Sequence, residues 1–451
     1  MQATKQVAEF ISQTGFAEIP AEVLPAAKRA ILDCTGCALA GSKEPAGKLI
    51  TELSKQVGGN PVATVIQGDF KTSAPDAALA NGTIAHALDY DEMDGGSPSH
   101  NSVIVLPAIL ALGEQEKASG KDVLAAYIIG FEMATRTSHI MGRVHWNEGW
   151  HSTSTAGTMG SVAAASKLLK LDSHKVAMAL AIAASQASGL MQQFGTMTKP
   201  FHAGMASRAG VVSAMLARLG FTGDENILEG KAGYFKVLGK KEDWEFEGLP
   251  ASLANPCFSI LSPGVYFKQH VCGGANQPAV DAILQIARSH RISPDEVETI
   301  EAIVPDLMIR ECTHHRPKTA LEGKFSLEFT ISIALLEGQV RLAQVTDEKV
   351  QAPRTKELIE RIKVTGHEPT DSDPDRLIVT LRDGRQYIEP TGPIKGGKKP
   401  LSDDELIDKY RDCARLALSE KDISRSIEMI QNLEQLTDIQ QLTGLLGTPS
   451  A

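Results

Sequence analysis

The chain has 451 residues, of which 42% are hydrophobic and 22% are charged, as is typical of a globular protein that buries a large core. Its net charge of −10 argues against nucleic acid and anionic membrane surfaces as partners. No run of about 18 apolar residues is present, so we expect no membrane span. The N-terminus lacks the basic start and apolar core of a signal peptide, and the cytoplasm is the expected compartment.

Helical spacing of apolar residues dominates the first half of the chain. It predicts helices over residues 3–14, 20–41, 75–90, 103–117, 121–140, 156–169, 173–190 and 203–219, with one short β-like run at 62–68. These helices are rich in small residues, which allow close packing in a compact core. Cys34 and Cys37 fall within an apolar helical stretch, and the six cysteines show no disulfide framework. We therefore interpret this pair as buried packing rather than as a zinc or redox site.

One polar segment, residues 89–102, separates two of the predicted helices. It holds four carboxylates, two glycines, one proline and the histidine His100, which is more than a plain helix–helix connection needs. Asn101 or Ser102 can cap the helix that follows. Because a helix N-terminus favours negative charge, a side chain at this position is well placed to meet an anion.

The same arrangement recurs at three later helix starts. His151 precedes one predicted helix, Lys199 and His202 lie at the start of another, and Gln277 lies at the start of a third. Taken singly, each of these loops is ordinary capping chemistry. Their repetition favours one shared pocket for an anionic substrate.

The pattern changes near residue 266. β-like runs at residues 297–304, 361–365, 377–381 and 386–388 follow a predicted helix at 279–289, and the turn at 382–385 predicts a hairpin. Residues 392–400 are rich in Gly, Lys and Pro and indicate a linker or surface loop. Residues 402–446 are helical again from a capping-box-like start. We predict a mainly α protein, in which residues 1–267 and 402–451 form an all-helical domain and residues 268–401 form a smaller α+β domain.

The chain contains no dinucleotide glycine fingerprint, Walker loop or nucleophile elbow. His86 and Asp89 lie three residues apart on one predicted helix, but no second histidine follows at matching spacing, so we predict no metal site. If the substrate is an acid, local cations must overcome the negative net charge of the chain. Lys199, Arg208 and Lys268 are the candidates.

Several stretches together resemble the MmgE/PrpD family. They are residues 81–91, 100–107, 149–165, 198–204, 268–281, 323–327 and 436–439. The resemblance runs nearly from end to end, and as a set these motifs are specific.

This family includes 2-methylcitrate dehydratase, cis-aconitate decarboxylase and iminodisuccinate epimerase. The resemblance implies a large all-helical domain built from both chain ends, a smaller α+β lid and a homodimer. It also implies chemistry on small di- or tricarboxylates with no metal and no organic cofactor. Carried over position by position, the family's pocket falls on Asp89, His100, His151 and Lys199, with His202 beside them.

Three positions depart from the family pattern. Gln277 stands where decarboxylases and many dehydratases carry a pocket histidine, and Phe329 stands where they carry a tyrosine. Met93 replaces a threonine of the decarboxylases. Two potential proton-transfer groups are lost, which argues against cis-aconitate decarboxylation and against any dehydratase mechanism that depends on them.

Three functions remain open: a dehydratase-like lyase, an epimerase or isomerase of an α-substituted dicarboxylate such as iminodisuccinate, and a non-catalytic relative that binds a carboxylate. In both catalytic cases negative charge builds beside a carboxylate, and an acid and a base must flank the reacting carbon. We predict His100 and His151 as the acid–base pair, because histidine suits both roles near neutral pH.

The other predicted roles follow from charge. Lys199 would bind a substrate carboxylate, and Asp89 would orient a histidine or act as a second base. The predicted substrate-binding residues are His202, Gln277, Lys268 and Arg208. The simpler readings are a solvated helix-end carboxylate for Asp89, a surface cation for Lys199 and a core histidine for His202.

Overall fold

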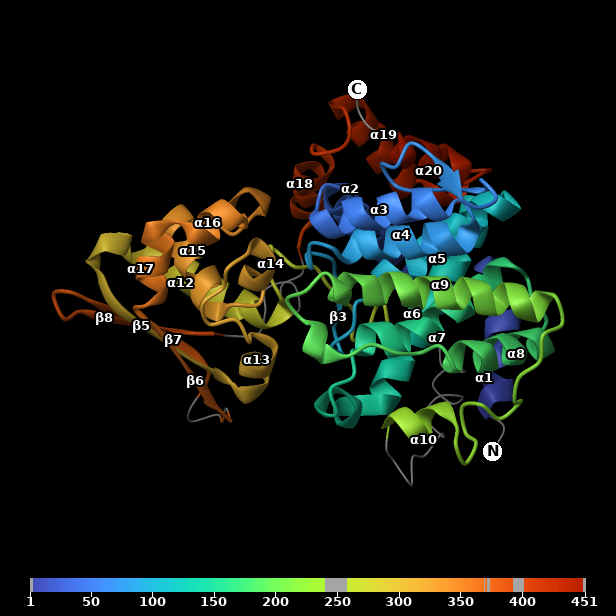
Figure 1. Ribbon diagram of the computed structural model, residues 1–451, viewed down its shortest axis with the longest axis horizontal. Helices are drawn as coiled ribbons and strands as arrows, with labels where there is room; N and C mark the ends of the chain where they lie inside the picture. Colours follow the sequence, from blue (N-terminus) through green and yellow to red (C-terminus); the bar gives the residue numbers. More distant parts are fainter. Residues whose placement is uncertain (1–2, 240–257, 369, 371–373, 392–400, 449–451) are drawn as a thin grey trace.

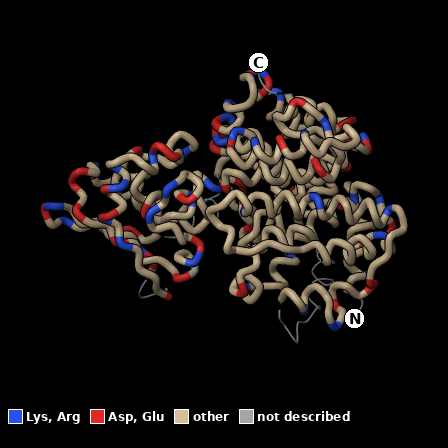
Figure 2. The backbone as a smooth tube through the Cα atoms, viewed as in Figure 1, with Lys and Arg blue, Asp and Glu red and all other residues tan. Residues whose placement is uncertain are grey.

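The computed structural model describes residues 3–239, 258–368, 370, 374–391 and 401–448. A large body of helices adjoins a smaller body built around a sheet, and we call these the helical part and the sheet part (Figure 1). Basic and acidic residues are interspersed along the backbone of both parts (Figure 2). Within the described ranges, no helix combines the length and the apolar character that crossing a membrane requires.

The helical part contains helices from both ends of the chain (Figure 1). Its helices are α1 (Ala3–Gln13), α2 (Val23–Gly41), α3 (Pro45–Val57), α4 (Ala74–His86), α5 (Ser102–Glu116), α6 (Gly120–Asn147), α7 (Ser152–Leu168), α8 (Ser173–Ala184), α9 (Thr198–Arg218), α10 (Tyr234–Gly239), α18 (Asp403–Ala414), α19 (Glu420–Gln431) and α20 (Gln440–Gly447). One cluster of buried apolar residues joins the N-terminal helices to the C-terminal ones. The two chain ends therefore share one core.

Glycines allow the central helices to approach closely. On α4 and α9, a Cβ on Gly82 would lie 2.9 Å from the Cα of Gly204, and one on Gly204 would lie 2.2 Å from Thr83 Oγ1. No side chain fits at either position. This contact brings the end of α4, at His86, beside the first turn of α9, which carries Lys199.

Helix α18, from the C-terminal end of the chain, packs on α2 and contacts the 89–91 segment through Lys409. Ser402 and Glu405 form the capping box that starts α18, as the sequence predicts. Lys409 of this helix is buried, and its Nζ lies 2.6 Å from Asp33 Oδ1 of α2 and 2.7 Å from the backbone oxygen of Tyr90. Its ammonium group also lies 4.0 Å from the centre of the Tyr90 ring.

The sheet part contains four strands in the order β6-β5-β7-β8. They are β5 (Val297–Pro305), β6 (Ile362–His367), β7 (Arg376–Leu381) and β8 (Gln386–Pro390); β5 and β6 are parallel, and the other pairs are antiparallel. The predicted hairpin is confirmed as β7–β8. Helices α12 (Gln277–His290) and α15 (Leu327–Glu337) pack against this sheet and complete the second core. Shorter helices are α13 (Asp306–Glu311), α14 (Ala320–Gly323), α16 (Asp347–Gln351) and α17 (Pro353–Ile359).

The expected elements are largely present, but their bounds shift. The helix expected at 75–90 ends at His86, and α9 begins at Thr198, so Lys199 lies in its first turn and His202 in its second turn rather than in a loop. The run at 62–68 forms only a two-residue strand, β1 (Ala63–Thr64), paired with β2 (Lys71–Thr72). The linker expected at 392–400 lies outside the described residues.

Other outcomes concern the cysteines and the domain boundaries. Cys34 and Cys37 are buried free thiols in α2, which confirms the packing interpretation. The second apolar cluster also takes in Leu88 and Tyr90 from the helical part. Since that cluster crosses the junction, the proposed domain boundaries at residues 268 and 402 stay a prediction.

Candidate active site

Helix ends meet where the helical part adjoins the sheet part. The end of α4 and the starts of α5, α7 and α9 come together there, and the segment after strand β4 (Val265–Tyr266) crosses them. The predicted site residues that meet at this point are Asp89, His100, His151, Lys199, His202 and Lys268. All of them except His202 are buried, so the readings of Asp89 and Lys199 as solvated surface groups are wrong.

Asp89 is the centre of this cluster. It takes a left-handed backbone conformation with φ of 52°, which aspartate tolerates better than most residues. Its Oδ1 accepts hydrogen bonds from Lys199 Nζ at 2.9 Å and from Lys268 Nζ at 3.0 Å. Burial acts to raise the pKa of Asp89, but the two ammonium groups outweigh it and hold the pKa well below its usual range. The ionised carboxylate thus fixes both lysines.

Asp91 lies between two histidine rings. Its carboxylate is 3.0 Å from His86 Nδ1 and 2.8 Å from His100 Nδ1, and the backbone oxygen of Glu92 is 2.9 Å from His100 Nδ1. All these neighbours accept hydrogen bonds, so each Nδ1 carries a proton and donates it. Burial acts against ionisation of Asp91, but the two imidazoles outweigh it and hold the pKa of Asp91 well below its usual range.

The Nε2 atoms of the same two rings are therefore unprotonated. His86 Nε2 accepts a hydrogen bond from Lys199 Nζ at 2.8 Å. His100 Nε2 lies 3.7 Å from Asp89 Oδ1, too far for a hydrogen bond. Burial lowers the pKa of His100 to about 4, although Asp91 acts against this shift. His100 is consequently neutral at pH 7 and offers a free lone pair inside the cluster.

His151 and His202 form a second histidine pair. His151 is the N-cap residue of α7, and its Nδ1 lies 3.1 Å from Nδ1 of His202. Burial, with the charge of Lys199 acting in the same direction, lowers the pKa of both rings, that of His202 to about 4. Two neutral rings at this distance share one N–H···N hydrogen bond. A proton can therefore pass between buried His151 and partly exposed His202.

Aromatic rings from both parts enclose Lys199. Its Nζ lies 5.2 Å from the ring centre of Phe194 in the helical part and 5.5 Å from that of Phe325 in the sheet part. The ring of Phe194 also meets His151 edge-on, with 5.0 Å between centres. Burial lowers the pKa of Lys199, and Asp89 acts against this shift. These apolar walls strengthen the electrostatic interactions within the cluster.

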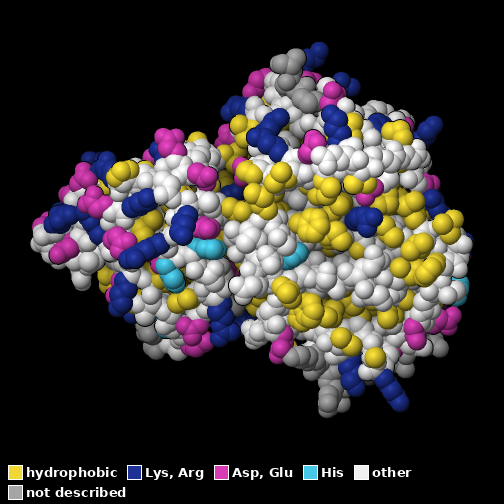
Figure 3. Space-filling view, viewed as in Figure 1, with side chains coloured by type: hydrophobic (Ala, Val, Ile, Leu, Met, Phe, Trp, Pro, Cys, Tyr) yellow, Lys and Arg dark blue, Asp and Glu magenta, His cyan; other side chains and the backbone are white. Residues whose placement is uncertain are grey.

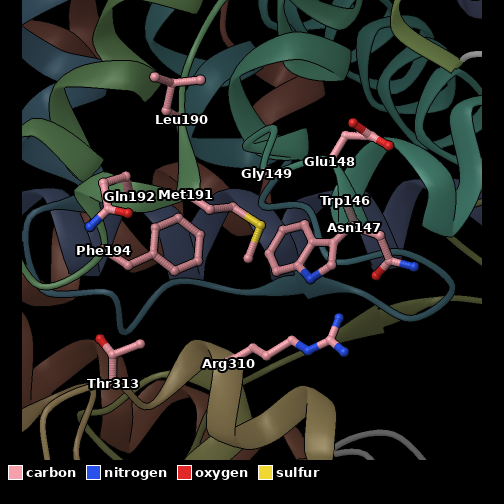
Figure 4. Close-up of a pocket in the computed structure, with 10 residues that line it drawn as sticks. All are labelled: Trp146, Asn147, Glu148, Gly149, Leu190, Met191, Gln192, Phe194, Arg310 and Thr313. Atoms are coloured by element: carbon pink, nitrogen blue, oxygen red, sulfur yellow. The ribbon is translucent and has the colours of Figure 1, made fainter.

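Phe194 also lines a cavity of about 400 Å³ between the two parts (Figure 4). Its walls come from residues 146–149 at the end of α6, from residues 190–194, and from Arg310 and Thr313 of the sheet part. A cavity of this size fits a small organic acid.

Two further carboxyl groups border the cluster. Asn101 is the N-cap residue of α5, one of the two predicted, but its side chain makes no capping hydrogen bond. Glu92 Oε1 instead accepts a hydrogen bond from the backbone N–H of Ser102 at 2.8 Å. Burial raises the pKa of Glu92 to about 8. Burial also raises the pKa of Glu311, at the end of α13, to about 7, while Lys199 acts against this rise and Asp89 adds to it. Glu311 is thus a titratable group of the sheet part whose pKa responds to the charges of the cluster.

Four of these side chains have the spacing of metal ligands. The atoms that lie within 4.8 Å of one another belong to His86, Asp89, Asp91 and His100. His100 supplies the second histidine that the spacing along the helix lacked. However, Lys199 and Lys268 place two ammonium groups within 3.0 Å of Asp89, so a divalent ion would have to displace them. The donor set fits lysine-bound anions better than a metal ion.

Two predicted substrate-binding residues have other partners. Gln277 Oε1 accepts from the backbone N–H groups of Gln269 and His270, and its Nε2 donates to the backbone oxygens of His270 and Cys272. Its amide therefore holds the loop that follows Lys268. Arg208 is partly exposed on α9 and pairs with Asp76 at 3.4 Å, at the far end of α4 from His86.

The other two positions that depart from the family pattern have structural surroundings. Phe329 is fully buried in the core of the sheet part. Met93 pairs with Tyr266 in the β3–β4 ladder, where β3 is Met93–Asp94, and its sulfur lies against Gly274. Neither side chain offers a transferable proton.

Sequence reasoning missed three residues of the cluster. His86 was weighed only as a metal ligand, although its place one helical turn before Asp89 was a usable signal. Asp91 was hidden in the acidic run, because its role depends on the left-handed turn at Asp89. Glu311 had no signal in the sequence, since only the tertiary fold brings α13 to this place.

Comparison with known proteins covers almost the whole chain. The MmgE/PrpD N-terminal domain matches residues 5–247, and the MmgE/PrpD C-terminal domain matches residues 270–435. The chain is 31% identical to the cis-aconitate decarboxylase of Mus musculus over 95% of this chain and 90% of that protein. The cis-aconitate decarboxylases of Homo sapiens and Aspergillus terreus (strain NIH 2624 / FGSC A1156) are 30% and 28% identical, over 95% and 99% of this chain and 91% and 96% of their own lengths.

Proposed function

Because this chain belongs to the MmgE/PrpD family, we propose that it is a lyase that acts on a small di- or tricarboxylate by acid–base proton transfer, without a cofactor. One observation carries the proposal: His100 Nε2 is an unprotonated, unbonded base within a few ångströms of a carboxylate that holds two lysines. The cis-aconitate decarboxylases that resemble the chain are lyases by their names and support the same class of reaction.

The lysines have hydrogen-bonding capacity left for a substrate. Lys199 Nζ donates to His86 and Asp89, and Lys268 Nζ donates to the side chain and the backbone of Asp89. An ammonium group has three donors, so each lysine keeps one N–H for a substrate carboxylate. Both are held by Asp89 before the substrate arrives, so little reorganisation is needed when charge builds on the substrate.

Proton transfer is assigned to the histidines. His100 Nε2 takes or returns the proton at the reacting carbon, while Asp91 holds the ring in the required tautomer. His151 faces the cluster from the start of α7, and its bond to His202 gives it a path for a proton. Charge on the carbon next to a carboxylate is stabilised by Lys199 and Lys268.

The bond that breaks is a separate question. Decarboxylation of an unsaturated acid needs a site for the departing carboxylate and one proton for the carbon left behind. Dehydration needs a base for the proton next to a carboxylate and an acid for the leaving hydroxyl. Glu311, with a pKa of about 7, is a candidate acid for the second case, although Gln277 and Phe329 are not proton carriers.

An epimerase of an α-substituted dicarboxylate is the second candidate. It needs proton removal and return but no acid for a leaving group. The apolar or backbone-bound side chains at Met93, Gln277 and Phe329 favour it, because they leave fewer acids near the cluster.

Proton NMR in deuterated water tests these assignments. The purified protein is incubated with cis-aconitate, citrate, methylcitrate, malate and iminodisuccinate. We expect an elimination or decarboxylation product that disappears in His100→Asn and Lys199→Met. Deuterium entering an α-carbon with inversion and no elimination would replace the lyase by the epimerase, and no reaction with any acid would favour a carboxylate-binding protein.

The homodimer is also a proposal. Leu49, Leu53 and Val57 form an exposed stripe at spacing four along α3. Figure 3 shows apolar side chains gathered on the same face of the helical part. Large exposed apolar patches mark interaction sites. Light scattering should give the mass of two chains for the wild type and of one chain for Leu53→Glu; an unchanged dimer in that variant would exclude this face.

A further inference from the structure

The cavity beside Phe194 holds two hydrogen-bond donors that no other described side chain uses. Trp146 is 7% exposed, yet its buried Nε1–H has no acceptor among the described residues. Arg310 lies in the last turn of α13, and no carboxylate among the described residues pairs with its guanidinium. In Figure 4 the indole nitrogen points to the side of the cavity on which the guanidinium lies. A buried unpaired donor is unfavourable, and so a ligand that accepts from it is expected.

The rest of the lining suits an acid with a hydrocarbon stem. Trp146, Phe194 and Met191 belong to one small apolar cluster, which forms an aromatic and thioether wall. The polar groups around that wall are the side-chain amides of Asn147 and Gln192 and the hydroxyl of Thr313. Glu148 is the one carboxylate among the residues that line the cavity, and in Figure 4 it points away from Arg310.

We propose that this cavity is a carboxylate-binding subsite outside the catalytic cluster, in which Arg310 and the Trp146 N–H hold a carboxylate of the substrate before the molecule passes Phe194. The inference rests on the proposed function in taking the ligand to be a small carboxylic acid. Arginine binds carboxylates through paired N–H groups, and the indole N–H adds a donor from the opposite part of the protein. The subsite is therefore complete only where the helical part and the sheet part meet.

Phe194 connects the subsite to the cluster. It lines the cavity, and the same ring meets His151 and Lys199 at 5.0 and 5.2 Å. Glu311, which follows Arg310 on α13, responds to the charges of Lys199 and Asp89. A carboxylate held by Arg310 thus waits next to the catalytic cluster.

Calorimetry with propane-1,2,3-tricarboxylate, a saturated acid, tests the subsite without turnover. In the His100→Asn protein, Arg310→Ala should weaken binding about 10-fold or more, since a charged hydrogen-bonding group is lost. Arg310→Lys should restore part of it, and Trp146→Phe should weaken it several-fold while keeping the aromatic wall. Arg354→Ala is the matched control, because Arg354 is exposed in the same part and pairs with Asp295; it should leave the affinity unchanged.

Measurements in a second parent variant distinguish binding at the subsite from binding at the catalytic cluster. In Lys199→Met the loss caused by Arg310→Ala should persist. An Arg310→Ala affinity equal to that of the parent protein, or an Arg310 effect that vanishes in Lys199→Met, would overturn the proposal. Because these measurements need no reaction, they fail independently of the lyase assignment, which fails if no acid in the NMR panel reacts or if the only reaction is exchange with inversion at an α-carbon.

Discussion

Two buried lysine–aspartate arrangements contact the segment 89–91. They differ in which N–H donors and lone pairs remain free for a ligand. Lys409 reaches Asp33 at 2.6 Å and the backbone oxygen of Tyr90 at 2.7 Å, and the Tyr90 ring covers its ammonium group. We call this arrangement closed because its ammonium group has no donor left for a ligand, although the two carboxylate oxygens of Asp33 accept no hydrogen bond from the described residues. Lys199 and Lys268 are as deeply buried, but each keeps one N–H, and His100 Nε2 beside them keeps a lone pair.

This difference distinguishes a substrate-binding cluster from a buried ion pair that only stabilises the fold. Both arrangements bury lysine against aspartate, and a search for buried ion pairs would find both. Only the open one combines fixed donors with an unbonded base, which is what substrate binding and proton transfer require. Variants of the open arrangement should therefore change activity, and variants of the closed one should change stability.

The largest expected effect is on activity at His100. In His100→Asn the amide nitrogen of the shorter side chain takes the place of Nδ1 and can still donate to Asp91, whereas Nε2 is lost. Turnover of the acid that reacts in the NMR panel should fall by about 10²–10⁴-fold, as for a lost general base. Urea unfolding should show little change. A variant that keeps more than a tenth of the activity would remove His100 from the acid–base role.

Breaking the closed arrangement should cost stability instead. Lys409→Met leaves Asp33 buried without its cation, and the free energy of unfolding should fall by about 3–5 kcal/mol. Urea titration followed by circular dichroism measures this change. The double variant Asp33→Leu/Lys409→Met removes both charges and should recover most of the loss. Equal losses in the single and the double variant would show that packing, not a stranded charge, is responsible.

The pH dependence of stability sharpens the same comparison. The pKa of His100 is lowered to about 4 in the folded state by burial, against about 6.5 in the unfolded chain. The contribution of neutral His100 to the free energy of unfolding is therefore present above pH 6.5. It is lost as the pH falls from 6.5 toward 4, because the unfolded chain binds the proton first. For His100 this loss in the free energy of unfolding is about 3 kcal/mol, from about 1.4 kcal/mol per pKa unit.

Unfolding at pH 7 and pH 4.5 measures this loss. His100→Asn should flatten the decline, while His174→Asn, a control at an exposed histidine, should leave it unchanged. Parallel curves for the wild type and His100→Asn would mean that His100 is not kept neutral in the fold. The closed pair at Lys409 contains no histidine, but burial raises the pKa of Asp33, with Lys409 acting against this rise, so this carboxyl opposes the decline as the pH falls.

The sequence predicted the fold better than the details of the site. Periodicity located most helices of the helical part and the β7–β8 hairpin, because these depend on local patterns. Three of the four polar helix starts bring His100, His151 and Lys199 to one place, as the repetition of the motif suggested. Local sequence patterns could not predict the roles of Asp91 and Glu311. The role of Asp91 depends on the left-handed backbone at Asp89, and that of Glu311 depends on the packing of the sheet part.

Gln277 and Arg208, which the sequence analysis predicted to bind substrate, instead have protein groups as partners. Each lies on a helix that starts at the site, and sequence alone gave both a role in binding. The amide of Gln277 is used by the backbone of its own loop, which no spacing rule reveals. Arg208 is two or three turns beyond Lys199 on α9, and each turn carries it about 5.4 Å farther from the cluster.

The smallest expected effect is at this third aspartate–basic pair, Arg208 with Asp76. It has the same chemistry as the other two, but the arginine side chain is 40% exposed and the pair spans 3.4 Å. Exposed pairs contribute about 0–1 kcal/mol, because water competes for both charges. Arg208→Ala should therefore change the free energy of unfolding by less than about 1 kcal/mol and leave KM unchanged. Lys268→Met, measured beside it, should raise KM strongly, since it removes a cation from Asp89. If Arg208→Ala raised KM as much as Lys268→Met, charge at a distance would govern substrate binding, and the open N–H groups of the buried cluster would not be what distinguishes it.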